Sequence, residues 1–246
     1  MILQRVRRRL RLGRFEAPSI APAFLEQAKL VDGIETPTIF DVGAHVGHIT
    51  ELYLRLFPTA RVFAFEPAAE ARKKLEEIAA RNPGAKVFDT AVSDRKGVSV
   101  FYQNSFSPTN SLHPVDDRAT RHWDGRLLTP SATSEVSTVA LDEFCSEQGV
   151  NRIDVLKLDI QGGELAALRG TRRLLTEQAV GLVYLELLLV PTYRHQANLV
   201  DICCLLKEYD YEFHSAYDPC IHERRVNQLD AIFVSRRLKL EDRSGL

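Results

Sequence analysis

Glycines and acidic residues follow two apolar runs near the start of the chain. The segment DVGAHVG places Gly43 directly after the run TIFDV and Gly47 four residues later. Glycine lets a backbone turn tightly and approach a ligand, and the amide groups that open a following helix favour an anionic group. Glu66, followed by Pro67, stands 25 residues after Asp41. Because an acid at about this spacing accepts hydrogen bonds from ribose hydroxyls, the two features together indicate a nucleotide-type ligand.

Two further runs end in residues that suit the same kind of site. Ala91, Val92 and Ser93 are small or polar and can border an adenine ring. Asp159 ends a later run and opens the segment DIQGGE, a second glycine turn that leads into a helix-like segment. Ligands of open α/β sheets bind beyond the carboxyl ends of the strands, near the point where strand order reverses. We therefore expect these residues to lie near one another.

The elements that must position these residues alternate along the chain. Between most of the expected strands lie segments with helical spacing of apolar residues, and this alternation predicts a mostly parallel sheet covered on both faces. The last two strands are joined by a loop, so one strand is expected to run antiparallel. The prediction is an α/β fold with a seven-stranded sheet. Strands are expected at 38–42, 61–66, 85–92, 153–159, 180–187, 211–216 and 229–235, and helices at 48–57, 68–81, 163–177 and 196–209.

Residues 104–134 interrupt this alternation with a polar stretch that contains Pro108, Pro114 and Pro130. About 30 residues without regular structure inside a compact domain are usually functional or disordered. We expect a partly mobile cover over the site.

Length and charge exclude several classes. The chain has 246 residues, 45% of them hydrophobic, which favours one large domain with appendages. Its 32 basic and 33 acidic residues give a net charge of −1, which argues against a nucleic-acid partner. The longest apolar stretch, 180–190, is too short to span a bilayer and contains Glu186. Free thiols in a reducing cytoplasm are expected because no C-x-x-C pair occurs among the cysteines, Cys145, Cys203, Cys204 and Cys220.

The domain division expected is a basic arm or helix over 1–36, a main domain over 37–236 and a polar tail over 237–246. The arm places Ile2, Val6 and Leu10 at helical spacing among six arginines. This pattern is compatible with a basic amphipathic helix on an anionic membrane, here the inner face, or with a solvated arm. Both interpretations stay open.

Seven motifs together resemble the FkbM family of S-adenosylmethionine-dependent methyltransferases. They occur in family order as FDVGAHVGHIT, FAFEP, TAVSDRKGVSVFY, TNSL, VSTVALDEF, KLDIQGGE and LVYLEL. The resemblance implies a Rossmann-like class I methyltransferase fold, S-adenosylmethionine as cofactor and S-adenosylhomocysteine as product. Two positions depart from the family. His45 stands where Asn is usual, and Gln161 replaces the acid of the usual motif D-V-E-G-A-E.

By resemblance, the turn at Gly43 and Gly47 holds the methionine part of the cofactor, Glu66 the ribose and the segment 91–94 the adenine edge. Asp159 would border the sulfonium, whose positive charge favours nearby carboxylates. The residues expected to bind cofactor are Asp41, Gly43, Ala44, His45, Gly47, Thr50, Glu66, Pro67, Ala91, Val92, Ser93 and Asp159.

The resemblance also implies transfer to oxygen, on a hydroxyl of a sugar, glycan or polyketide-like metabolite. A hydroxyl is a poor nucleophile near neutral pH, so a positioned base would add about 10² to 10⁴ in rate. The catalytic candidates are Asp159, Glu186 and His195, with His113 also considered, and a structural role for each stays open. Glu186 lies in an apolar run, where burial should raise its pKa. His113, Asp116 and Asp117 lack diagnostic metal-site spacing, and no metal is expected.

Two alternatives from other classes remain. A nicotinamide-dependent dehydrogenase has this architecture, but the first turn lacks G-x-G-x-x-G. A catalytically weak or inactive nucleotide-binding module would keep the pocket, and Gln161 in place of an acid makes that alternative relevant.

Overall fold

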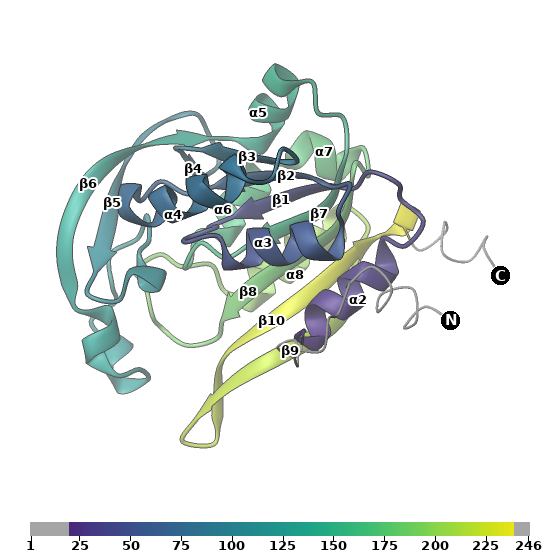
Figure 1. The fold of residues 1–246 in the computed structure, drawn as a ribbon. Coiled ribbons are helices and arrows are strands. Elements are labelled where there is room, and N and C mark those ends of the chain that lie inside the picture. The colour runs from purple at the N-terminus through teal and green to yellow at the C-terminus, as the bar shows by residue number, and fades with distance from the viewer. Residues whose placement is uncertain (1–19, 239–246) are drawn as a thin grey trace, which may run out of the picture.

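The computed structural model describes residues 20–238. A seven-stranded sheet with the strand order β3-β2-β1-β7-β8-β10-β9 forms its centre (Figure 1). β10 runs antiparallel to both of its neighbours, and the other neighbouring strands pair in parallel. The predicted fold class, including its one reversed strand, is confirmed. The strands are β1 Thr38–Val42, β2 Arg61–Phe65, β3 Ala85–Phe88, β7 Ile153–Leu158, β8 Val180–Leu188, β9 Tyr211–His222 and β10 Arg225–Ser235.

The strand order reverses between β1 and β7. After β1 the chain builds outward through β2 and β3, and it then returns to place β7 on the other side of β1. Val42 and Leu158 are partners in the β1–β7 register, so the residues that follow them emerge side by side. Gly43 and Asp159 thus meet at the reversal point, where open α/β sheets bind their ligands.

Helices cover both faces of the sheet. α2 and α3 lie on one face and α8 on the other (Figure 1). On the first face, the Phe24 ring meets the edges of Tyr53 and Tyr184 at centroid distances of 5.7 and 5.5 Å. α2 therefore packs as part of this layer. The helices are α2 Pro22–Leu30, α3 His48–Leu56, α4 Ala69–Ala80, α5 Leu141–Gln148, α6 Glu164–Arg169, α7 Arg172–Thr176 and α8 Leu199–Glu208.

A second, three-stranded sheet has the order β4-β6-β5. Its strands are β4 Ala91–Val92, β5 Gly97–Asn104 and β6 Pro130–Val139. The single strand expected over 85–92 was wrong, because β3 ends at Phe88 and β4 pairs with β6 instead. The helix expected over 163–177 divides in two at Gly170, where an added Cβ would lie 2.2 Å from the Ser93 carbonyl oxygen.

The segment 104–134 is more regular than the sequence suggested. It contains three short 3-10 helices, Ser107–Thr109, Ala119–Arg121 and Gly125–Leu128, before β6 begins at Pro130. Hydrogen bonds join it to the strand ends, from Ser111 Oγ to the Gln161 carbonyl and between Ser107 Oγ and His45 Nε2. This segment is therefore placed over the reversal point, and its mobility remains a prediction.

Residues 1–19, which contain the arginines of the expected arm, and the last residues of the tail lie outside the described residues 20–238. The two interpretations of the arm therefore stay predictions. Within the described range, no helix is both long and apolar enough to cross a membrane.

Candidate active site

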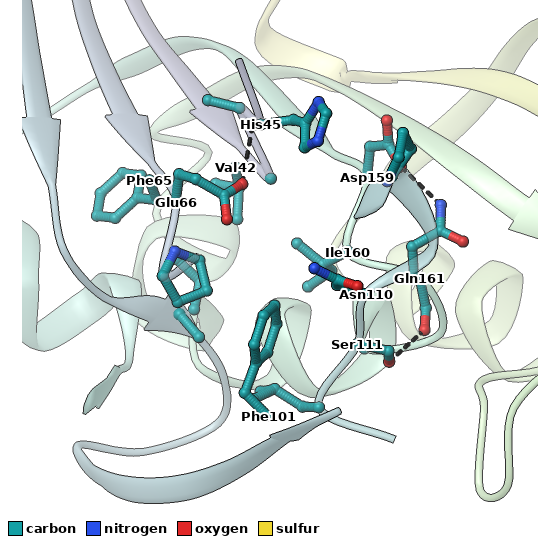
Figure 2. A pocket seen from close by; sticks show the side chains of 18 of the residues that line it. Val42, His45, Phe65, Glu66, Phe101, Asn110, Ser111, Asp159, Ile160 and Gln161 are labelled. Atoms are coloured by element: carbon teal, nitrogen blue, oxygen red, sulfur yellow. Dashed lines mark hydrogen bonds between the residues drawn. The ribbon is translucent and has the colours of Figure 1, made fainter. Parts of the chain in front are cut away.

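A pocket of about 280 Å³ opens at the carboxyl ends of β1, β2 and β7, beneath the segment 104–112 (Figure 2). Its wall includes a large part of the set predicted from the sequence. Glu66 and Asp159 lie on opposite sides of the opening in this view. The predicted residues that line it are Gly43, Ala44, His45, Glu66, Pro67, Ala91, Val92 and Asp159.

The turn after β1 depends on backbone conformations that favour glycine. Gly43 and Gly47 have φ values of +75° and +89°, and His45 between them has +48°. Asn and His are enriched among non-glycine residues with positive φ, so His45 suits this turn. At Gly43 an added Cβ would lie 1.9 Å from the carbonyl oxygen of Asp159. The β1 and β7 turns can approach this closely only because residue 43 has no side chain.

We expect Gly43→Ala to destabilise the fold by about 2 kcal/mol, because it adds steric overlap to the strain of a positive φ. Gly33→Ala is the matched control, since Gly33 has a φ of +94° but no atom within 4 Å of an added Cβ. Urea unfolding of both variants measures the difference. Equal losses of stability would show that the contact with Asp159 is unimportant.

The Glu66 carboxylate is held by two backbone N–H groups at the end of β2. His45 N donates to Oε2 and Ala68 N donates to Oε1, each at 2.8 Å. Only 6% of the residue surface is exposed. Burial raises the pKa of this carboxyl, and the two hydrogen bonds favour the ionised form. Each oxygen keeps a lone pair, and the carboxylate points into the pocket (Figure 2).

Four predicted cofactor residues lie away from the pocket wall: Asp41, Gly47, Thr50 and Ser93. Gly47 packs against α4, where an added Cβ would meet Leu75 and Ile78. Asp41 is fully buried, and its Oδ2 accepts a 2.6 Å hydrogen bond from Thr50 Oγ1. Side chains alternate along a strand, so Asp41 faces α3 and Val42, its neighbour in β1, lines the pocket instead. Ser93 comes directly after Val92 but does not line the pocket, and its N–H donates to the Val139 carbonyl.

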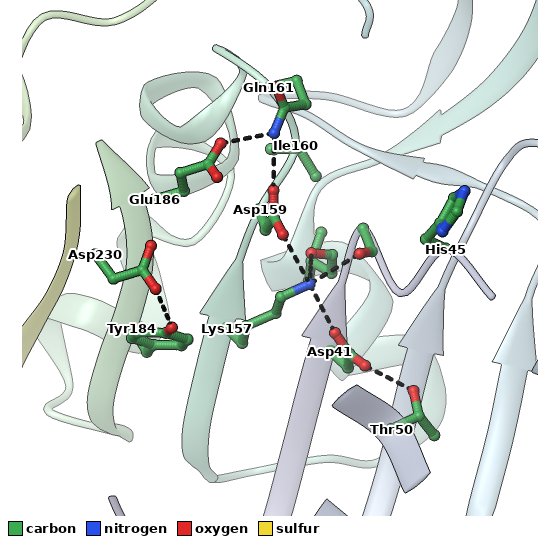
Figure 3. A network of polar contacts seen from close by, with 12 residues as sticks. Asp41, His45, Thr50, Lys157, Asp159, Ile160, Gln161, Tyr184, Glu186 and Asp230 are labelled. Atoms are coloured by element: carbon green, nitrogen blue, oxygen red, sulfur yellow. Dashed lines mark hydrogen bonds and ion pairs between the residues drawn. The ribbon is translucent and has the colours of Figure 1, made fainter. Parts of the chain in front are cut away.

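Lys157 was missed by sequence analysis, although it stands in the motif KLDIQGGE. Its ammonium lies 3.0 Å from Asp41 Oδ1 and 3.7 Å from Asp159 Oδ2, and it donates to the Gly43 carbonyl at 2.8 Å (Figure 3). Burial would lower the pKa of Lys157, but the Asp41 and Asp159 carboxylates outweigh it and raise the pKa. Lys157 thus neutralises the charge of Asp41 and, through its hydrogen bond to the Gly43 carbonyl, stabilises the glycine turn.

Asp159 and Glu186, two of the catalytic candidates, are linked by one amide group. Gln161 Nε2 donates to Asp159 Oδ1 at 3.0 Å and to Glu186 Oε2 at 2.6 Å (Figure 3). The Asp159 side chain lines the pocket and is 41% exposed, whereas Glu186 lies behind the wall. Burial, followed by the charges of Asp159 and Glu164, raises the pKa of Glu186 well above its ordinary value. Burial was expected from the sequence to raise the pKa of Glu186, and the shift has this direction and this main cause.

The third candidate, His195, does not share the pocket. It lines a separate hollow near the end of β8, together with Tyr193 and Gln196. His113 lies near it, and burial lowers the pKa of His113. Within residues 20–238, no cluster of three or more His, Cys, Asp or Glu side chains is arranged to hold a metal ion. Asp116 and Asp117 are paired with Arg118 and Arg194.

The segment over the pocket adds residues for which sequence analysis gave no role. Asn110 Oδ1 accepts a hydrogen bond from Asn104 N at 2.8 Å, which turns the amide nitrogen toward the pocket (Figure 2). Phe101 of β5 adds an aromatic ring to the wall. Asn110 belongs to the motif TNSL, which was the available signal.

Glu164 gives the second glycine turn a pH dependence. Its carboxylate accepts hydrogen bonds from the N–H groups of Ile160 and Gly162 at 3.1 and 3.0 Å. Burial raises the pKa of Glu164 to about 7 from the ordinary 4.5. Between these values the folded chain binds more protons than the unfolded chain, so stability falls as pH rises and levels off above about 7.

This loss should be about 3 kcal/mol. Urea unfolding across this pH range should show a steeper decline for the wild type than for Glu164→Gln, which cannot ionise at this position. Parallel stability curves for the two proteins would contradict the assignment.

The sheet order, the glycine turn at the reversal point and the buried acid at the end of β2 define a Rossmann-like methyltransferase fold with a nucleotide-type pocket. A family model described as the methyltransferase FkbM domain matches residues 41–213. The chain belongs to the FkbM family of S-adenosylmethionine-dependent methyltransferases. This finding confirms the resemblance seen in the motifs.

Several relatives of known name are similar to the chain. The 2-O-methyltransferase NoeI of Sinorhizobium fredii is 29% identical over 188 residues, which cover 71% of this chain and 72% of that protein. The 31-O-demethyl-FK506 methyltransferase FkbM of Streptomyces tacrolimicus is 30% identical, over 60% of this chain and 65% of that protein. The hexuronic acid methyltransferase AglP of Haloferax volcanii is 28% identical, over 64% and 59%. The chain thus spans less than two thirds of the latter two proteins.

Among solved structures, fibrillarin of Aeropyrum pernix in complex with natively bound S-adenosyl-L-methionine aligns with 86% of this chain and 74% of that chain. The sequence identity is 12% and the TM-score is 0.48.

Proposed function

We propose that the protein transfers a methyl group from S-adenosylmethionine to a hydroxyl of a sugar, glycan or polyketide-like metabolite. The observation that carries the cofactor assignment is the Glu66 carboxylate, which keeps a lone pair on each oxygen toward the pocket. The names of three relatives support transfer to oxygen or to a sugar acid, since they describe a 2-O-methyltransferase, a 31-O-demethyl-FK506 methyltransferase and a hexuronic acid methyltransferase.

The pocket residues fit the cofactor by chemistry. Glu66 would accept hydrogen bonds from both ribose hydroxyls, and the backbone N–H groups at the start of α3, where His48 and Ile49 line the pocket, would bind the carboxylate of the methionine part. Ala91, Val92 and Phe101 offer apolar surface for the adenine. Asp159, on the side of the pocket opposite Glu66, would lie near the sulfonium.

The cofactor supplies an electrophilic methyl carbon when bound. Asp159, which lines the pocket, would accept the proton that the acceptor hydroxyl gives up when its oxygen is methylated. Holding the two reactants in line can lower the barrier by about 7–11 kcal/mol, so positioning supplies most of the catalysis. Glu186 does not line the pocket and is connected to Asp159 through the amide of Gln161. We assign no role to His195, because it lies outside the pocket.

Family membership leaves no support for the nicotinamide-dependent dehydrogenase. The inactive binding module stays as the second candidate, since Gln161 stands where an acid is usual. The four cysteines are free thiols, which supports our proposal of a cytoplasmic location.

The test is incubation of the purified chain with S-adenosylmethionine and a panel of sugars, glycans and polyketides, followed by mass spectrometry. We expect an acceptor that gains the mass of one CH₂ group, on oxygen, and an equal amount of S-adenosylhomocysteine. Cofactor binding without a methylated product across the panel would favour the inactive module.

A further inference from the structure

Gln161 lies between two acidic side chains and is held in one orientation. Its amide nitrogen has two hydrogens, and both are used, one toward Asp159 and one toward Glu186. Its Oε1 lies 3.0 Å from the Tyr193 hydroxyl, on the other side of the amide group. The donor end of the amide thus faces the two acidic side chains, and its oxygen faces the Tyr193 hydroxyl.

The backbone of Gln161 is fixed as well. Its φ is +56°, and its carbonyl accepts a hydrogen bond from Ser111 Oγ at 2.7 Å. The Tyr193 hydroxyl also reaches the Thr109 carbonyl at 2.7 Å. Ser111 and Thr109 belong to the segment over the pocket. Gln161 therefore connects the end of β7 to the segment that covers the pocket.

We propose that Gln161 is a positioning residue whose amide group bridges Asp159 and Glu186 and fixes the direction in which the Asp159 carboxylate meets the reactants. This inference rests on the proposed function, because it takes the cofactor sulfonium to lie beside Asp159. Asp159 Oδ1 accepts a hydrogen bond from Gln161, and Oδ2 lies 3.7 Å from the Lys157 ammonium. Each oxygen of the Asp159 carboxylate is therefore oriented by a neighbouring side chain.

An acid at position 161 could not perform this role. A carboxylate of the same shape would have no hydrogen to donate, and it would place a further negative charge against Asp159. The charged and titratable groups that surround this cluster come from each neighbouring element: His45 after β1, Asp41 of β1, Lys157 of β7, Glu164 of α6, Tyr184 of β8, Tyr193 after β8, and Asp230 of β10. Lys157 is the one lysine or arginine in this set.

The test compares two ligands that differ in charge at sulfur. S-Adenosylmethionine is a cation there and S-adenosylhomocysteine is neutral, so the ratio of their affinities reports the negative charge that faces the sulfur, while shared contacts cancel. Titration calorimetry measures both affinities without any acceptor. This readout is separate from turnover, and a purely structural role for Gln161 would leave the ratio unchanged.

Gln161→Met keeps the length of the side chain but removes both donors. We expect the preference for S-adenosylmethionine over S-adenosylhomocysteine to fall by about tenfold, because the Asp159 carboxylate loses its fixed direction toward the sulfonium. In Gln161→Glu, we expect the preference to rise with pH more steeply than in the wild type, because the added carboxyl loses its proton. Should Gln161→Met fail to fold, Gln161→Glu carries the test alone.

Gln228→Met is the matched control. Gln228 Nε2 donates to Glu186 Oε1 from β10, so this change removes an amide donor from Glu186 and leaves the hydrogen bond between Gln161 and Asp159 in place. We expect its ligand preference to stay within about twofold of the wild type. An unchanged preference in folded Gln161→Met would overturn the role of Gln161, and so would an equal fall in Gln228→Met. If Gln161→Met does not fold, a pH response of Gln161→Glu no steeper than that of the wild type would overturn it. If the wild type binds neither ligand, the proposed function itself fails, which is a distinguishable result.

Discussion

Glu66→Ala is expected to weaken the binding of S-adenosylmethionine by about 1,000-fold. The variant loses two hydrogen bonds from ribose hydroxyls to a charged acceptor, each worth about 1.5–3 kcal/mol. Their sum corresponds to at least two powers of ten in affinity, since about 1.4 kcal/mol changes a dissociation constant tenfold. S-Adenosylhomocysteine has the same ribose, so its affinity should fall equally.

Titration calorimetry with both ligands measures this effect. Glu66→Gln should be intermediate, with a loss of about tenfold or more, because one oxygen still accepts a hydrogen bond. Glu70→Ala serves as the control on the same stretch of chain, since Glu70 is exposed and paired with Lys73. An affinity of Glu66→Ala within a few-fold of the wild type would remove Glu66 from the cofactor site.

Lys157→Met is expected to destabilise the fold by about 3–5 kcal/mol. The reason is that Asp41, which is fully buried, would lose the cation 3.0 Å from its Oδ1. Removing one partner of a buried ion pair leaves an uncompensated charge, which typically costs this amount. Urea unfolding at neutral pH measures the loss.

The double variant Lys157→Met with Asp41→Asn should recover most of that stability, because neither charge remains buried. Lys73→Met provides the control, since this exposed lysine pairs with exposed Glu70 and should change stability by about 0.5 kcal/mol or less. A double variant no more stable than Lys157→Met alone would show that the charge of Asp41 is not the cause.

The sequence predicted the fold through local signals. Runs such as 38–42 and 180–187 are mostly apolar, as buried parallel strands are, and the short connection before β10 indicated its reversal. Glu66 and the glycine turn were identified because both follow a strand directly. In contrast, the boundary between β3 and β4 depends on pairing with β6, a segment far along the chain that local periodicity does not report.

The site was less predictable where partners come from distant parts of the chain. Asp41 was expected beside the cofactor, and its partner Lys157 follows 116 positions later, on the neighbouring strand. A closer use of strand alternation would have placed Asp41 on the face opposite Val42. His195 lies in an irregular segment after β8, so no periodic pattern indicated that it would miss the pocket.

The most direct test of the account is a crystal structure of the chain with S-adenosylhomocysteine. We predict the ligand in the pocket at the ends of β1, β2 and β7, with both ribose hydroxyls within hydrogen-bond distance of the Glu66 carboxylate and the sulfur on the side of Asp159. Ligand density elsewhere, or a ribose that does not contact Glu66, would contradict it.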